Sequence, residues 1–275
     1  MNRLSASIRR RELVSAIDAQ RMYALYSTYY SATSPDRFAA DLAAKDYVIE
    51  LEEDGELRGF STLAILDFQA GGAARRALYS GDTIIDHHYW GEQALATAFC
   101  RFAGALRASD PNTPLYWFLI TKGHRTYRYL GAFSREYHPH PSLPSPLLVA
   151  QCLDVLARSR FGPAWRPESG IVRFEGSRGH LNPLWSPPRA SLASRPETRF
   201  FVERNPGHAD GDELCCLTEL AAANLRSYAR RAFVEGYDEN SPPVSVDRRW
   251  RAGVSPIAGV GANAAAQPAR VDRLG

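Results

Sequence analysis

The spacing of hydrophobic and polar positions divides the first part of the chain into short, regular elements. The pattern predicts a short strand, two amphipathic helices and then three strands. These elements are expected at residues 12–17, 18–32, 34–43, 47–51, 57–66 and 77–85. Asp54-Gly55 separates the first two of the three strands and tolerates the positive φ of a tight hairpin turn. The three strands are therefore expected to form an antiparallel meander, with a bulge or close backbone approach at Gly81.

Four more elements follow before a proline-rich stretch. The pattern predicts a strongly amphipathic helix, a buried strand, a short helix and a last strand. These are expected at residues 87–107, 115–121, 122–133 and 134–139. Four prolines then interrupt regular structure at positions 139, 141, 144 and 146. A first domain covering residues 1–141 follows from this order.

The remaining sequence is less regular. A helix is expected at residues 145–162, two strands around a Gly/Asp-rich turn within residues 198–220, and a helix at 221–233. We interpret residues 142–237 as an accessory α+β region. Residues 238–275 are rich in Pro, Gly, Ala and Arg without apolar periodicity, so they are expected to be a disordered tail.

Composition narrows the class of protein. The chain has 275 residues, a formal net charge of +3 and two lysines, Lys45 and Lys122. Its four cysteines show neither a CxxC pair nor metal-ligand spacing with histidine, so no metal site is expected. The N-terminus lacks a signal-peptide core and no segment is long enough to span a membrane. A cytoplasmic protein is predicted.

Residues 10–138 resemble the GNAT superfamily of acyl-CoA N-acyltransferases. The resemblance rests on the order of elements and on two local motifs. YRYLGAF, from Tyr127 to Phe133, is similar to the Y-x-x-L-G-F end of the fourth helix of the family. The second motif lies where the family places a Q/R-x-x-G-x-G/A pyrophosphate-binding turn. The resemblance implies an α/β (α+β) fold with a mixed, mostly antiparallel sheet flanked by helices.

The pyrophosphate turn matches this pattern only in part. Gly91 stands at the first glycine, while His88 replaces Gln/Arg and Gln93 replaces the second glycine. Trp90 would narrow the approach of a phosphate and Glu92 would repel it. The resemblance assigns these five residues to the donor, which is an acyl-CoA or an acyl-carrier-protein thioester. As an alternative, Asp86 caps a helix and Glu92 favours the positive end of the helix dipole.

The resemblance also suggests catalytic residues. Backbone at Ser80 and Gly81 occupies the bulged strand whose amide polarises the thioester carbonyl in the family. Tyr127 matches the tyrosine that protonates the leaving thiolate, although it could instead pack in the core. Asp82 and His124 are candidates for the base that deprotonates the amine, as is His88, and Asp82 could equally bind its ammonium.

The basic and aromatic stretch KGHRTYRYLGAF, residues 122–133, suggests two kinds of partner. Its cations and tyrosines could track nucleic-acid phosphates and stack on bases. No second basic stripe is visible and the net charge is low, so no nucleic-acid partner is expected. The cations, Arg125 among them, are instead expected to meet the 3′-phosphate of CoA or an acidic carrier protein.

The sequence thus predicts an N-acyltransferase that moves an acyl group to a primary amine of a small molecule or peptide. The aromatic residues of the first helix favour a longer acyl chain. The acidic loop at residues 203–214 would select the acceptor if it lay over the site. The alternative is a non-catalytic GNAT-fold module that binds acyl-CoA or a protein partner.

Overall fold

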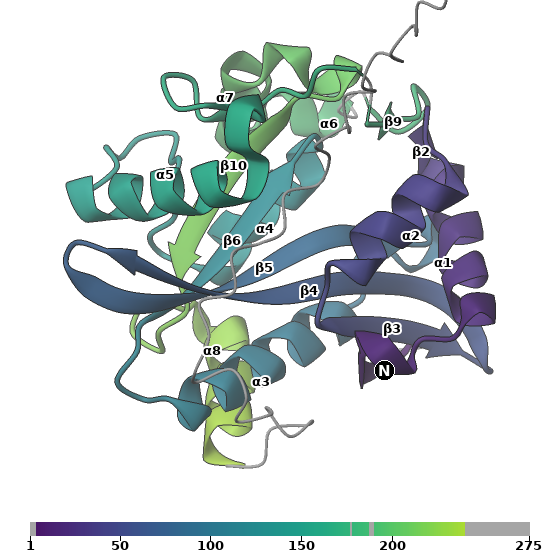
Figure 1. Cartoon of the computed structure of the whole chain (residues 1–275), viewed down its shortest axis with the longest axis horizontal. Coiled ribbons are helices and arrows are strands. Elements are labelled where there is room, and N and C mark those ends of the chain that lie inside the picture. The colour runs from purple at the N-terminus through teal and green to yellow at the C-terminus, as the bar shows by residue number, and fades with distance from the viewer. Residues whose placement is uncertain (1–3, 177, 187–189, 240–275) are drawn as a thin grey trace, which may run out of the picture.

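The computed structural model describes residues 4–176, 178–186 and 190–239 and centres on one eight-stranded sheet. The strands lie in the order β1-β3-β4-β5-β6-β10-β8-β7 (Figure 1). Strands β5 and β6 are parallel, and each of the other neighbours in this sheet is antiparallel. The strands are β1 (Ser5–Arg10), β3 (Tyr47–Glu53), β4 (Glu56–Ala70), β5 (Ala73–Ile85), β6 (Leu115–Thr121), β7 (Trp165–Arg166), β8 (Ile171–Val172) and β10 (Glu213–Glu219). A separate two-stranded sheet joins β2 (Tyr30–Ser31) to β9 (His180–Leu181).

Helices cover both faces of the large sheet. One face packs against α1, α2 and α5, and the opposite face packs against α3, α4 and α8. The helices are α1 (Ala16–Tyr29), α2 (Pro35–Ala43), α3 (Ala94–Ser109), α4 (His124–Phe133), α5 (Leu147–Phe161), α6 (Ala190–Ala193), α7 (Pro196–Arg204) and α8 (Ser227–Asp238), with 3₁₀ turns η1 (Arg11–Leu13), η2 (His87–Tyr89), η3 (Gly162–Ala164) and η4 (Pro206–Asp210). Among the residues described, no helix is long and apolar enough to cross a membrane.

The predicted fold class and meander are confirmed. Strands β3, β4 and β5 pair in sequence as antiparallel neighbours. Asp54 and Gly55 adopt φ values of 53° and 77°, which gives the tight turn between β3 and β4. The sheet is mixed, mostly antiparallel and flanked by helices, because in the described part of the chain only one crossover, through α3, joins parallel strands.

The N-terminal strand lies earlier than the sequence pattern predicted. The strand expected at residues 12–17 is wrong: β1 ends at Arg10 and a 3₁₀ turn follows. Ser15 caps α1, and its side chain and that of Asp18 exchange hydrogen bonds with each other's backbone amides. This capping box starts the helix sooner than Asp18 alone would.

The helix expected from residue 87 begins only at Ala94. Asp86 caps the 3₁₀ turn η2 instead, by accepting the backbone amide of His88 at 3.0 Å. Gly91 has a φ of 103°, which an α-helix does not contain, so the turn interrupts the helical path.

Two further expected strands are wrong. Residues 134–139 form only isolated bridges, Ser134 to Leu225 and His138 to Leu217. The first of the two strands expected within residues 198–220 is the helix α7, which has Pro196 at its first turn and buries Phe201.

The accessory region contributes to the same sheet as the first part of the chain. Strand β10 pairs with β6 along six residue pairs, and β8 and β7 follow outside it. Helix α8 packs closely on α3, where glycines Gly104 and Gly236 let the two backbones approach. The division at residue 141 stays a prediction. The expected tail lies outside the described residues from position 240 onward.

Candidate functional site

The site begins where β5 separates from β6. Their parallel pairing ends at Ser80 and Leu119, although β5 continues to Ile85, and Figure 1 shows the two strands diverging beyond this point. At the same level the register of β4 against β5 shifts, so that Gly81 and Asp82 together oppose Thr62. This arrangement is a β-bulge, as the glycine in the strand predicted. We call the region beyond Ser80 and Leu119 the β5–β6 fork.

Gly81 makes room at the bulge for a buried lysine. A Cβ at this position would lie 2.6 Å from Lys45 Cε and 2.7 Å from Thr62 Oγ1. The Lys45 side chain is fully buried, and its ammonium binds the carboxylate and the main-chain oxygen of Asp41. The Thr62 hydroxyl is also buried and has no hydrogen-bond partner among the described residues. A polar atom left in this state at a bulge is a natural contact for a ligand or a water.

The second lysine lies on the other side of the fork. Lys122, directly after β6, places its Nζ 3.2 Å from Glu213 Oε1 and 3.0 Å from the carbonyl oxygen of Gly179. Both side chains of this ion pair are largely buried. The two lysines of the chain and three carboxyls therefore meet at the fork. We call Asp41, Lys45, Asp82, Lys122 and Glu213 the Asp82 cluster.

Asp82 differs from the other carboxyls of this cluster. Asp41 and Glu213 each form an ion pair with a lysine, whereas no hydrogen bond reaches the Asp82 carboxyl from the described residues. Burial and the charge of Asp41 raise the pKa of Asp82 to about 7, against the opposing effect of Lys45 and Lys122. The residue is half-buried. It is thus a carboxyl that can exchange a proton near neutral pH.

Tyrosines line the cluster on the face covered by α1 and α5. Tyr26 and Tyr30 stack with ring centroids 4.6 Å apart, and Lys122 Nζ lies 5.6 Å from the Tyr30 ring centre. The ring centre of Tyr79 lies 5.9 Å from Lys45 Nζ. Burial, and next the nearby Asp82 charge, raise the pKa of both Tyr26 and Tyr30. These phenols therefore stay protonated and give the site an aromatic, weakly polar wall.

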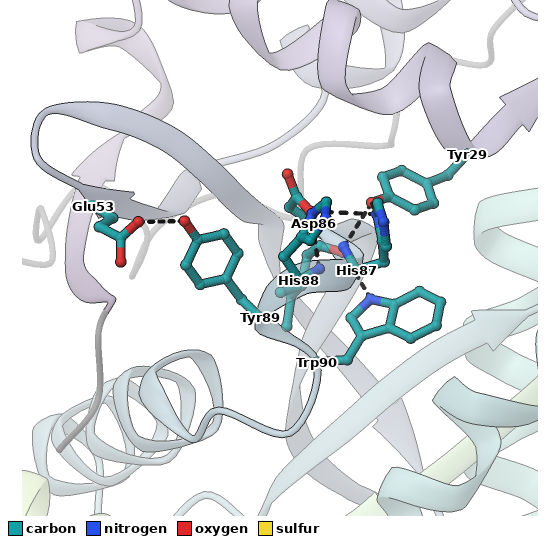
Figure 2. Close-up of polar contacts among 8 residues, drawn as sticks. Tyr29, Glu53, Asp86, His87, His88, Tyr89 and Trp90 are labelled. Carbon is teal, nitrogen blue, oxygen red and sulfur yellow. Dashed lines mark hydrogen bonds and ion pairs between the residues drawn. The ribbon is translucent and has the colours of Figure 1, made fainter.

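The residues expected to bind a pyrophosphate lie on the turn between β5 and α3 (Figure 2). His88 and Gly91 are exposed, and Gln93 donates to the carbonyl oxygen of Gly91 at 3.2 Å. Glu92 accepts the backbone amide of Leu4 at 3.1 Å, so one of its oxygens is directed to the N-terminal segment. The turn is shaped by internal bonds, and its role toward a donor stays a proposal.

Trp90 is held among other side chains at this turn. Its indole donates to the carbonyl oxygen of Ile85 at 2.8 Å, and its ring meets that of Trp185 at a centroid distance of 5.3 Å. The Arg125 guanidinium lies 4.6 Å from the Trp90 ring centre and donates to the carbonyl oxygen of Trp185 at 2.9 Å. Arg125 and the tryptophans thus bind one another next to the fork.

Tyr127 and His124 lie away from Asp82, on the other face of the sheet. The Tyr127 side chain is fully buried against Phe200 and Phe201 of α7, and its hydroxyl donates to the carbonyl oxygen of Pro139 at 2.8 Å. His124 is buried too, and burial, with smaller effects of nearby cations, lowers its pKa to about 4. Tyr127 occupies the core, as the alternative interpretation had it, rather than a position facing the fork.

The structure therefore brings together only part of the predicted site. Gly81 and Asp82 meet at the bulge, while the Ser80 hydroxyl accepts the Trp117 indole hydrogen at 2.8 Å on the other face. Sequence reasoning missed the roles of Lys45, Lys122 and Thr62. The rarity of lysine in an arginine-rich chain was the one signal that could have indicated the first two.

Comparison with known proteins gives a limited result. No family profile and no curated protein matches the sequence. Similar solved structures include a probable N-acyltransferase from Enterococcus faecalis V583, an acyl-CoA N-acyltransferase from Pseudomonas aeruginosa, and the GNAT family N-acetyltransferase YhbS from Escherichia coli in complex with CoA. Their identities to this chain are 14%, 15% and 17%, and their TM-scores are 0.36, 0.34 and 0.33.

The matches cover 48%, 47% and 47% of this chain and 33%, 88% and 69% of the respective structures. This chain thus matches about a third of the length of the first structure. The three are named as N-acyltransferases or GNAT proteins, the type that residues 10–138 resemble in sequence.

Proposed function

We propose that this protein transfers an acyl group from a thioester to a primary amine, with Asp82 as the general base. The observation that carries the proposal is the Asp82 carboxyl, half-buried at the β5–β6 fork, with a pKa of about 7 and no hydrogen bond from the described residues. A base whose pKa lies near neutral pH combines adequate basicity with a substantial ionised fraction. The sequence resemblance supports acyl transfer as the reaction type. The Asp82 carboxyl supports an amine as the acceptor, because a carboxylate can bind an ammonium and take a proton from it.

The steps follow from this geometry. The acceptor arrives as an ammonium and binds ionised Asp82, which gives the Asp82 cluster a compensating positive charge. Asp82 takes one ammonium proton, and the neutral amine forms a C–N bond to the thioester carbonyl. The backbone at Gly81 is the candidate donor to the developing oxyanion. The C–S bond then breaks while the nitrogen of the intermediate loses its second proton, which the leaving thiolate takes up, and Asp82 releases the first proton to solvent.

The acceptor is expected to be a slender primary amine. It has to reach a half-buried carboxyl that is bordered by Tyr26 and Tyr30, and the two stacked rings favour an apolar stem behind the ammonium. Asp41 and Glu213 are already paired with lysines, so they leave a single free negative charge for the ligand. A small molecule or an unbranched peptide side chain meets these conditions.

The donor is an acyl-CoA or an acyl-carrier-protein thioester, which would lie across the fork toward the turn of residues 86–93. The packing of Trp90 with Arg125 and Trp185 favours the carrier protein. A carrier brings only its slender prosthetic arm to the fork, whereas CoA also needs room for its nucleotide at this turn.

The test follows thiol release by the purified chain. Acyl-CoAs and acyl carrier proteins of several chain lengths are supplied alone and with mixed primary amines. We expect thiol release that depends on the amine and that Asp82→Asn reduces at least about a hundredfold. Absence of amine-dependent thiol from every donor would contradict the proposal.

A second candidate function is binding of an acyl thioester without turnover. It is favoured by the packed Trp90 and by Glu92, which is directed to Leu4 rather than arranged around an anion. Donor binding by calorimetry together with no amine-dependent thiol release would support this second function and exclude the first.

A further inference from the structure

Asp86, His87 and His88 place three potential metal ligands at one point beside α1 (Figure 2). The Asp86 Oδ1 atom lies 2.8 Å from His88 Nδ1 and 3.4 Å from His87 Nδ1. The three ligand atoms all lie within 4.8 Å of one another. Around a tetrahedral ion with bonds near 2.1 Å, neighbouring ligand atoms are about 3.4 Å apart, so little movement is needed to enclose one.

Tyr29 of α1 adds an oxygen to this group as a fourth potential ligand atom. Its hydroxyl accepts the backbone amide of His87 at 2.7 Å and lies 3.1 Å from His87 Nδ1. The phenol oxygen is thus close to the ring nitrogen, so an ion bound at His87 Nδ1 would lie next to the Tyr29 oxygen.

The 3.4 Å separation of His87 Nδ1 and Asp86 Oδ1 is the separation expected of two ligand atoms of one tetrahedral ion. Capping of η2 needs only the bond from the His88 amide to Asp86. Both imidazoles lie close to the Asp86 carboxylate and Tyr29 contacts His87, which goes beyond what a cap requires.

An ion could reach this group from solvent. The His87 and His88 side chains are 40% and 68% exposed, and that of Asp86 is 23% exposed. The Asp86 carboxyl and the two imidazoles together offer a ligand set of oxygen and nitrogen.

We infer that Asp86, His87 and His88, with Tyr29 as a fourth ligand, bind one divalent transition-metal ion such as Zn²⁺. Imidazole nitrogen favours Zn²⁺, Cu²⁺ and Ni²⁺ over Mg²⁺ and Ca²⁺, which prefer oxygen. An ion bound at His88 Nδ1 would require the ring hydrogen to be on Nε2, so the hydrogen bond from this ring to Asp86 would be replaced by a bond to the ion. It would join the end of α1 to the turn before α3. The inference is independent of the proposed acyl transfer.

The experiment measures metal content rather than activity. The full chain is stripped with a chelator and dialysed against buffered Zn²⁺, and bound metal is determined by mass spectrometry. Co²⁺ loading adds a visible spectrum that reports tetrahedral coordination. We expect one equivalent of bound ion, a rise in melting temperature on loading, and weaker binding at lower pH.

Variants locate the ion. His88→Ala, at an exposed side chain, should raise the dissociation constant at least about tenfold, as should Asp86→Asn. Tyr29→Phe should change the Co²⁺ spectrum, and His140→Ala, at a histidine elsewhere in the chain, should leave binding unchanged. Equal metal uptake by the wild type and by a variant with both His87→Ala and His88→Ala would overturn the inference. So would an equal loss of binding in His140→Ala.

Discussion

The side chain of Lys45 lies directly against Gly81, so that a Cβ on the glycine would come within 2.6 Å of Lys45 Cε. This relationship connects α2, through Asp41 and Lys45, to the bulge that presents Asp82. A buried ammonium next to the half-buried Asp82 carboxyl limits how far the pKa of that carboxyl rises. The glycine is therefore needed for the charge balance at the site as well as for the bend of the strand.

Gly81→Ala is expected to displace Lys45 and lower the free energy of unfolding by about 1–3 kcal/mol. Amine-dependent thiol release should fall as well, because the bulge and the Asp82 carboxyl would shift together. Urea denaturation and the thiol assay check both effects. Gly123→Ala is the matched control, since its Cβ would meet its nearest neighbour at 3.4 Å, an ordinary contact. Equal stability and equal thiol release in Gly81→Ala and Gly123→Ala would contradict a role of Gly81 in making room for Lys45.

Asp82→Asn is expected to reduce turnover at least about a hundredfold while leaving the fold intact. The amide fills the same space but cannot take a proton from the acceptor. Asp67→Asn is the control, because Asp67 pairs with Arg76 outside the Asp82 cluster. The idea fails if both variants keep wild-type turnover.

The raised pKa of Asp82 predicts a definite dependence of stability on pH. The folded protein holds this proton up to about pH 7, whereas an unperturbed Asp has a pKa of 3.8. Between these values the folded state binds more protons, so the free energy of unfolding falls as pH rises through this window and stays lower above it. Asp82→Asn should not lose stability in this way, because the amide does not titrate. The free energy of unfolding of Asp82→Asn minus that of the wild type should therefore be about 2–4 kcal/mol larger at pH 8 than at pH 4.

Melting curves of both proteins at several pH values test this sign. The same ionisation should appear in the activity, with kcat/KM rising as pH increases through about 7 because the base must be deprotonated. A stability difference that does not change with pH would show that Asp82 titrates normally.

Tyr127→Phe is expected to lower the free energy of unfolding by about 1 kcal/mol and to leave kcat unchanged. The reason is that its hydroxyl donates to the carbonyl oxygen of Pro139 inside the core and lies away from Asp82. Denaturant titration and steady-state kinetics measure the two quantities. A large fall in kcat with unchanged stability would return Tyr127 to the mechanism.

Gly104→Ala is expected to destabilise the protein by about 3 kcal/mol. A Cβ on Gly104 would overlap the carbonyl oxygen of Phe233, and Gly236 meets the backbone of Arg101 in the same way. Helices α3 and α8 could not keep their present separation. Thermal melting beside the Gly123→Ala control checks this, and unchanged stability would mean that α8 does not pack as described.

The order of elements could be predicted well where local signals agree with packing. The meander from Tyr47 to Ile85 has apolar strands, and Asp54-Gly55 between the first two of them is typical of a tight hairpin turn. The region around α7 could not be predicted in this way. Phe200 and Phe201 suit a strand as well as a helix, and their packing on Tyr127 decides the outcome.

The sequence by itself determined the meander, the glycine of the bulge, and Asp82 as one candidate base among several. Only the tertiary structure decided between the candidates. Residues distant in the chain, Lys45, Lys122 and Glu213, surround Asp82 and raise or lower its pKa, whereas α7 covers Tyr127. The physical reason is that burial and charge at a side chain depend on which elements pack against it, and sequence spacing alone does not contain that information.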